Sequence, residues 1–197
     1  MPSSTVEVCN DALALVGDSP ITALTDDSDR ARTLNRLWLP TLDTKLREHD
    51  WNFARRRMAL AELADTPVWG YAHQFQLPQS PFCLFVRGTD LTEDEPWIIE
   101  TYSNATSTYR VLLTDATSVN LVFTARSEDV TLWDAGFADG MTFELAYRIA
   151  YPLTRNATLA QSLQTEKDKQ WQRARSRDGQ EGRPLTRLLS SVFTQNR

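Results

Sequence analysis

The sequence predicts an α+β fold that is mainly helical, with a bundle of about four long helices and a small inserted antiparallel β subdomain. Two observations carry this prediction. Apolar residues recur at helical spacing in the first and last parts of the chain, whereas the middle alternates and is enriched in Thr, Tyr, Val and Ile. We therefore expect N-terminal helices of the bundle over 1–57, the β subdomain over 58–127, C-terminal helices over 128–178 and a C-terminal extension over 179–197.

The first helix is expected over residues 4–16. Ser4 and Glu7 have the spacing of a capping box, in which each side chain accepts a hydrogen bond from the other residue's backbone N–H. Gly17 follows the last apolar position and is typical of a helix C-terminus. The helical spacing between them is set by Val6, Ala12, Leu13 and Val16.

A second, longer helix follows a run of N-cap residues at Asp26–Asp29. Its apolar stripe consists of Ala31, Leu34, Trp38, Leu42 and Leu46. Pro40 lies inside this stripe, and a proline removes one backbone hydrogen bond from a helix. We expect a kink near 36–40 rather than two separate helices.

The middle of the chain is expected to form short antiparallel strands. Cys83 also lies in a strand-like pattern, and the acidic stretch Asp90–Pro96 is expected to form a loop. The apolar positions that indicate strands are Phe75 and Leu77, Trp97–Ile99, Tyr109, Val111 and Leu113, and Val119, Leu121 and Phe123.

Two more helices are expected after residue 128. Ser127 or Asp129 would cap the first, which carries Phe137, Met141, Leu145 and Ile149 at i+4 spacing and would end at Tyr151–Pro152. The second would run over 156–177. Its expected inner edge consists of Leu159, Leu163, Gln170 and Ala174.

Charge is unevenly distributed along the 197 residues, whose net charge is −5. Residues 151–197 hold nine Lys and Arg against four Asp and Glu, whereas 1–150 hold twelve against twenty-two. The acidic body argues against a general nucleic-acid binder. The basic C-terminal part indicates contact with an acidic partner, or alternatively a solvated helix face.

Residue patterns typical of enzymes are scarce. The chain has two histidines and no Ser-x-Gly elbow, P-loop or HExxH motif. Cys9 and Cys83 have no CxxC partner or neighbouring histidine, so we interpret them as buried thiols rather than a metal site or a disulfide. We expect no enzyme activity, no cofactor, no metal and no membrane span. A carbohydrate-active site using the acidic loop and the six tryptophans is the weaker alternative.

The stretch HDWNFARRR, residues 49–57, is the densest local pattern. Three consecutive arginines beside Trp51 and Phe53 could bind phosphates and stack bases. We favour a structural corner of Trp51, Phe53 and Arg55, in which the two rings anchor the end of the second helix. The arginines would then face the dipole of that helix and nearby carboxylates.

The C-terminal extension contains a short amphipathic segment, which is marginal as an isolated helix and needs a surface to bind. Apolar anchors at this spacing are typical of a helix that docks into a groove. Candidate binding residues are Arg183, Leu185, Arg187, Leu188, Leu189, Val192 and Phe193.

The order of these elements resembles the head-to-tail adaptors (connectors) of tailed bacteriophages, of the tail tubular protein A type. The resemblance covers Met1 to about Arg177 and rests on loose motifs in a specific order. They are NDALALVGDSPITAL, then DDSDRARTLNRLWLPTLDTKLREHDWNFARRR, then FQLPQSPFCLFVRG, and finally FELAYRIAYPLT before a charged helix.

The resemblance implies a structural virion protein rather than an enzyme. Such adaptors form a ring, commonly of twelve copies, under the portal, and the lower face receives a tail nozzle or other tail protein. DNA passes through the lumen during genome ejection. The resemblance further implies that the C-terminal docking extension binds the portal through residues 184–197. A DNA-binding or packaging accessory protein that uses the basic C-terminal helix is the alternative.

Overall fold

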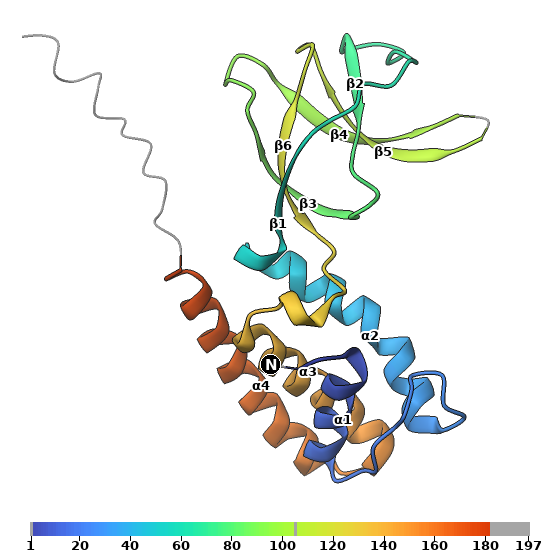
Figure 1. Ribbon diagram of the computed structural model, residues 1–197, viewed down its shortest axis with the longest axis vertical. Coiled ribbons are helices and arrows are strands. Elements are labelled where there is room, and N and C mark those ends of the chain that lie inside the picture. Colours follow the sequence, from blue (N-terminus) through green and yellow to red (C-terminus); the bar gives the residue numbers. More distant parts are fainter. Residues whose placement is uncertain (1, 105, 182–197) are drawn as a thin grey trace, which may run out of the picture.

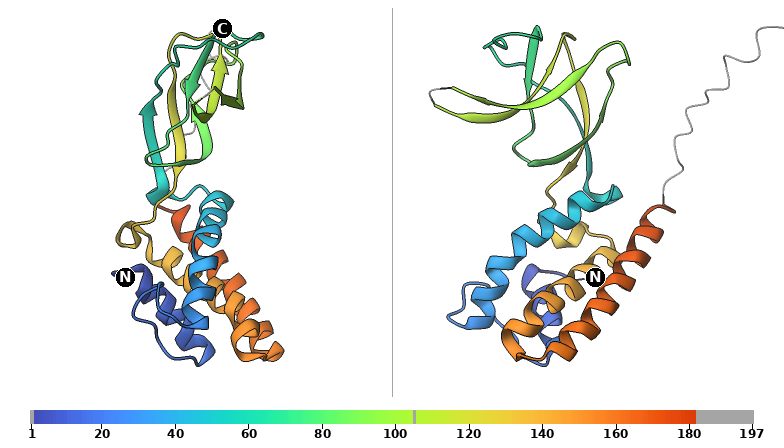
Figure 2. Two further views of the ribbon diagram at one scale, coloured as in Figure 1. Left: turned by 90° about the vertical axis from the view of Figure 1, so that its right-hand side faces the viewer. Right: turned by 180° about the vertical axis from the view of Figure 1, so that it is seen from behind.

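The computed structural model describes residues 2–104 and 106–181, which form an α+β fold with four α-helices and two small antiparallel sheets. The helices gather at one end of the molecule and all six strands at the other, as Figures 1 and 2 show. The chain passes from helices to strands after α2 and returns to helices before α3. The α+β class predicted from the sequence is therefore confirmed.

Helix α1 spans Thr5–Val16 and matches its prediction, although its N-terminal cap differs in detail. The Ser4 hydroxyl accepts a hydrogen bond from the Glu7 N–H at 3.2 Å. The Glu7 carboxylate accepts from the backbone N–H and hydroxyl of Ser3, at 2.6 and 2.8 Å, instead of from the Ser4 N–H. Gly17 ends the helix in the left-handed conformation, with φ of 75°, which glycine adopts without strain.

Helix α2 spans Asp29–Glu48 as one element that contains Pro40, and Ser28 caps it through the Ala31 N–H. All five residues of the predicted apolar stripe are buried. They face the other helices, so the amphipathic pattern accounts for the position of α2.

Helix α3 spans Ala135–Thr154, and both of its predicted ends are wrong. Asp134 is the N-cap, whereas Asp129 caps a short 3-10 turn over Val130–Leu132. The helix continues through Pro152 because proline has a helical φ and sacrifices only one hydrogen bond in the last turn. The four predicted core positions of α3 are fully buried: Phe137, Met141, Leu145 and Ile149.

Helix α4 spans Ala157–Asp178, one residue from each predicted end, and Asn156 caps it. Leu163 and Ala174 are buried as expected, whereas Leu159 and Gln170 are only partly buried. Trp171 and Asp178 are also buried, and the sequence did not predict this. The buried edge of α4 is therefore centred closer to Trp171 than the sequence indicated.

The strands form two three-stranded sheets. The first has the order β1-β6-β3, with β1 at Arg55–Ala59, β6 at Asn120–Ala125 and β3 at Cys83–Thr89. The second has the order β2-β5-β4, with β2 at His73–Gln76, β5 at Thr108–Thr114 and β4 at Trp97–Ser103. All ladders are antiparallel.

Two separate hydrophobic cores follow from this arrangement. The helical core includes Trp38, Trp51 and Phe137, and the β core lies between the sheets around Phe75, Leu112 and Phe123. Leu84 of β3 belongs to the helical core, so one apolar side chain of the β region packs among the helices, and polar contacts join the two regions around it.

Candidate functional site

The seven residues predicted to bind a portal lie outside the described residues. They are Arg183, Leu185, Arg187, Leu188, Leu189, Val192 and Phe193. The described candidate site is therefore the junction between the helical and β regions, which contains the predicted corner.

The corner segment turns the chain from α2 into the first sheet. After α2 ends at Glu48, a 3-10 turn over Asn52–Ala54 leads directly into β1. Trp51 is 1% exposed, and its indole N–H donates to the Lys45 carbonyl at 2.9 Å. This bond satisfies the single polar atom of a ring that is otherwise enclosed by apolar groups.

An aromatic cluster surrounds Trp51. Its ring centroid lies 5.0 Å from that of Phe137 in an edge-to-face arrangement and 5.9 Å from that of Trp171. Phe53 is half-buried and contacts Phe137 edge-to-face at 4.9 Å. Gly140 makes room for this cluster, since a Cβ there would lie 2.8 Å from the Trp171 ring. Helices α3 and α4 and the corner thus meet in one packed cluster.

Asp178, the last residue of α4, ties this helix to the corner. The Asp178 side chain is 3% exposed. It forms a salt bridge with His49, in which His49 Nε2 lies 3.0 Å from Asp178 Oδ2. Oδ1 accepts from the Asn52 backbone N–H at 3.0 Å, and the Asn52 amide donates to the Asp178 carbonyl at 2.7 Å. We call the set His49, Asn52 and Asp178 the latch. The latch holds the end of α4 against the start of the β region.

Arg87 on β3 joins the same corner to the sheet. It donates to the His49 carbonyl and to the Thr124 hydroxyl, both at 2.6 Å. Its Nε also lies 3.2 Å from the Asp50 carboxylate, which forms a second ion pair with Arg55. Burial lowers the pKa of Arg87, while the charge of Asp50 acts in the opposite direction.

The predicted role of the three arginines needs correction. Arg55, Arg56 and Arg57 do not lie at the end of α2 but form β1, because β6 pairs with this segment residue by residue. Arg55 does face a nearby carboxylate, that of Asp50, and Arg56 donates to the carbonyls of Phe53 and Arg55. The side chains at the end of α2 that fit its dipole are Lys45 and Arg47.

Glu144 of α3 is a buried carboxylate beneath the corner, 3% exposed. It accepts from Arg148 at 2.8 Å and from the Trp171 indole N–H at 3.1 Å, and lies 3.3 Å from the Lys45 ammonium. Burial acts to raise the pKa of Glu144, but the bond from Arg148 and the charges of Lys45, Lys167 and Arg148 outweigh it and lower the pKa.

A second ion pair spans the junction, between Arg126 and Asp43. It joins the residue after β6 to the C-terminal half of α2, and the Nε–Oδ1 distance is 2.7 Å. The bond to Asp43 raises the pKa of Arg126. Arg126 also lies over the ring of Phe82, 4.7 Å from its centroid. The helical and β regions are therefore connected by charged contacts on more than one element.

Sequence reasoning missed Glu144, Asp178 and Trp171 in this site. Trp171 carried a local signal, since it lies eight residues after Leu163 and three before Ala174 on the buried side of α4. Asp178 carried a subtler one, because an acidic residue at a helix C-terminus is unfavourable unless something compensates for it. Glu144 carried only its i,i+4 spacing to Arg148, because its other two partners come from α2 and α4.

The interpretation of both cysteines as buried thiols is confirmed. Cys9 and Cys83 are free and at most 1% exposed. Burial raises the pKa of Cys9 to about 12 and also raises that of Cys83. Over the described part of the chain, no group of three or more His, Cys, Asp and Glu could hold a metal ion. In the same residues, no helix is both long and apolar enough to cross a membrane.

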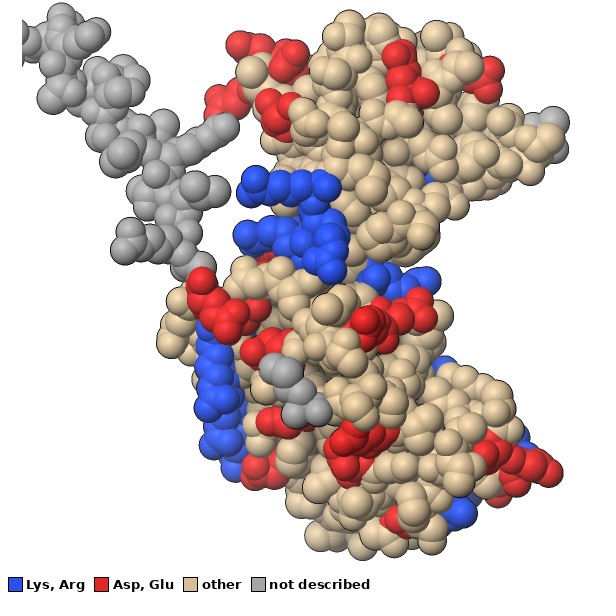
Figure 3. Space-filling view, in the orientation of Figure 1, with Lys and Arg blue, Asp and Glu red and all other residues tan. Residues whose placement is uncertain are grey.

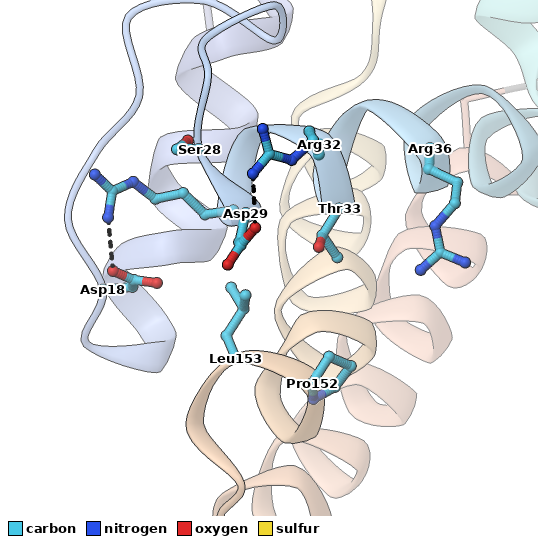
Figure 4. A pocket seen from close by; sticks show the side chains of 9 residues that line it. Asp18, Ser28, Asp29, Arg32, Thr33, Arg36, Pro152 and Leu153 are labelled. Atoms are coloured by element: carbon cyan, nitrogen blue, oxygen red, sulfur yellow. Dashed lines mark hydrogen bonds and ion pairs between the residues drawn. The ribbon is translucent and has the colours of Figure 1, made fainter.

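A surface hollow of about 660 Å³ lies between the first turns of α2 and the end of α3, shown in Figure 4. Its charges are largely paired, since Arg30 contacts Asp18 and Arg32 contacts Asp29. Arg36 also lines the hollow and lies apart from these two ion pairs, on the right in Figure 4. The pairing leaves little free charge for an anionic ligand.

Basic side chains gather on one side of the molecule. Figure 3 shows them where the helical and β regions meet and in a strip along α4. The exposed basic residues of the strip include Lys169, Arg173 and Arg177.

Comparison with known proteins does not assign the chain to a family: no family model matches the chain, and no curated protein matches it.

Proposed function

We propose that this protein is a structural head-to-tail adaptor of a tailed bacteriophage, which forms a ring under the portal and connects the head to the tail. The observation that carries the proposal is the order of elements. Two helices, an inserted β region and two further helices follow one another as the resemblance requires. In this proposal the four helices act as one bundle, the β region is an inserted subdomain and the C-terminal residues are a docking extension.

The C-terminal extension is proposed to bind the portal through residues 184–197. Two basic residues of the extension, Arg183 and Arg187, would meet acidic portal groups, and its apolar residues would fill a groove. The latch supports this role. It fixes the end of α4 against the corner, so an extension that begins there starts from a defined position.

The proposed ring also implies a DNA passage, a tail partner and a location in the virion. Twelve copies would surround a lumen through which DNA passes during ejection, while a tail nozzle or other tail protein binds the lower face. A lumen should not retain DNA, and every neutralised phosphate adds affinity. The excess of acidic residues in 1–150 favours passage over binding. The protein would thus be found in the virion, after assembly in the host cytoplasm.

Truncation tests the docking role directly. A variant that lacks residues 184–197 is expected to keep its fold but to lose binding to the portal ring. The matched control replaces Arg173 and Arg177 with alanine, which removes two exposed basic charges from α4 and leaves the extension intact. Full-affinity portal binding by the truncated protein would refute the docking role.

A DNA-binding or packaging role is the second candidate, and the basic strip on α4 favours it. Arg173 and Arg177 are exposed and form no ion pair within the described residues. This role requires affinity for duplex DNA that falls steeply as salt increases. A gel shift at low salt separates the candidates, because the adaptor is expected to give no shift at micromolar protein.

A further inference from the structure

The loop before β2 carries the two most exposed large apolar side chains of the described chain. Val68 is 97% exposed and Trp69 is 85% exposed, whereas the other exposed side chains of this kind lie between 37% and 53%. We call Val68 and Trp69 the knob. A tryptophan that stands in water costs solvation, and tryptophan is enriched among the residues that dominate the affinity of protein contacts.

The knob has no internal role that explains its exposure. Trp51, Trp133 and Trp171 are buried, and each donates its indole N–H to an acceptor within the chain. Trp69 donates to no acceptor among the described residues. The turn that presents it depends on Gly70, which has a φ of 92° that glycine adopts without strain. The backbone therefore holds the knob out without packing it.

The knob lies on the outer face of the second sheet. It lines a hollow together with Ile98, Glu100 and Tyr102 of β4. Side chains alternate along a strand, and the intervening Ile99 pairs with Leu112 of the β core. The three lining residues of β4 therefore point away from the core, toward the side that carries the knob.

A second hollow, of about 220 Å³, opens on the opposite face of the same sheet. Thr101 of β4 and Arg110 of β5 line it and pair with one another, so they share the inner face with Ile99. Leu77 also lines this hollow and belongs to the β core. We call this hollow the socket.

The socket offers groups that suit an indole ring. Pro78 and Phe82 line it with ring surfaces, and Phe82 is 37% exposed. The Arg110 guanidinium donates to the Cys83 carbonyl at 2.7 Å, which holds a cation at the socket, and tryptophan is the best aromatic partner of a cation. Gln79 is an exposed lining residue whose amide oxygen can accept the indole N–H.

Other hollows of the described chain suit an indole less well. The one in Figure 4 is lined largely by paired charges. The hollow beside the knob is formed by the loop of the knob itself. A further hollow on α4 is lined by polar side chains, namely Gln172, Arg173, Ser176 and Arg177.

We propose that the knob of one copy inserts Trp69 into the socket of a neighbouring copy of this chain. Knob and socket lie on opposite faces of one sheet, so each copy can contribute both, and the contact is head-to-tail and able to close into a ring. The β4–β5 hairpin projects sideways from the β region, which leaves both of its faces accessible (Figure 1). The inference deepens the proposed ring and rests on it for closure.

One such contact is weak by itself. An aromatic side chain buries about 150–250 Å², whereas stable protein interfaces bury about 1,200–2,000 Å². Two free copies therefore associate weakly through the knob. Chemical crosslinking, which traps short-lived contacts, is the suitable measurement.

Single cysteines in the full-length chain test the contact. A Val68→Cys protein is mixed with a Gln79→Cys protein and a short bis-maleimide, and peptide mapping identifies the crosslink between positions 68 and 79. Cys9 and Cys83 are buried and do not compete. We expect this crosslink well above the background set by Val68→Cys mixed with Thr165→Cys, whose cysteine lies at an exposed position of α4.

Substitutions in the knob and the socket test the assignment. Adding Trp69→Ala to the first protein should lower the yield about tenfold or more, as for a residue that dominates a contact. Adding Thr101→Trp to the second protein fills the socket and should lower the yield equally. Tyr151→Ala in the first protein is the matched control, because it removes another exposed ring, on α3, and should leave the yield unchanged.

A yield no higher than the background, or one that Trp69→Ala does not lower, would overturn the proposal. A yield that depends on Trp69 but not on Thr101→Trp would place the knob against another surface and would also overturn it. Because no portal is present, the specific crosslink without later portal binding would sustain this contact and refute only the adaptor role.

Discussion

Replacing Asp178 with alanine should destabilise the junction measurably, because this buried carboxylate accepts bonds from two other groups. Its removal leaves the Asn52 backbone N–H without its partner at 3.0 Å and removes the contact with His49. An orphaned buried donor costs about 1–3 kcal/mol, and a lost bond to a charged group about 1.5–3 kcal/mol. Relief of the unfavourable interaction between an acid and the helix C-terminus returns about 0.3–1 kcal/mol. The net expectation is a loss of about 1.5–6 kcal/mol in the free energy of unfolding.

Urea denaturation followed by far-UV circular dichroism measures this loss. Asp178→Asn should lose less, because the amide oxygen still accepts one of the two bonds. Asp168→Ala is the matched control on the same helix, since the Asp168 side chain is 67% exposed. It should change the free energy of unfolding by less than about 0.5 kcal/mol. If Asp178→Ala and Asp168→Ala unfold at the same urea concentration, the latch does not stabilise the fold.

Three further perturbations address the packing and charge under the corner. Trp51→Ala should cost about 3–5 kcal/mol of unfolding free energy, because it empties the centre of the aromatic cluster, and a shift under 1 kcal/mol would contradict this. Gly140→Ala should cost about 1–3 kcal/mol by forcing a methyl group against Trp171, whereas Gly179→Ala should be nearly neutral. The lowered pKa of Glu144 means that its stabilisation is complete above about pH 4.3 and is lost as the pH falls through the folded pKa. Unfolding free energy measured from pH 6 to pH 3 should therefore fall less in Glu144→Gln than in the unaltered protein.

The helices were predictable because their signals are local. A capping residue, an apolar stripe and a glycine or polar stop lie within one segment, so Ser4, Ser28 and Gly17 act at the expected ends. The C-terminal end of α3 was mispredicted because Pro152 was read as a stop, although a proline in the last turn sacrifices only one bond. The N-terminal end was mispredicted because Asp129 caps a separate 3-10 turn and Asp134 caps the helix.

The strand β1 was hidden because its signal is not local. Arg55–Arg57 carry no alternating apolar pattern, and the segment becomes a strand only because β6, more than sixty residues later, pairs with it. The same reason explains the latch. Asp178 meets Asn52 across 126 residues, and no spacing within either segment indicates that contact. The corner at Trp51 was accessible to sequence reasoning because a large aromatic ring at a helix end requires burial.

The most direct test of the adaptor role is the mass of the protein alone and in a mixture with its portal protein. Native mass spectrometry of the purified chain should show a monomer or weakly associated species. The mixture should show a discrete complex that carries a ring of this protein, with twelve copies expected. No complex in the mixture, or the same complex when residues 184–197 are removed, would contradict the account.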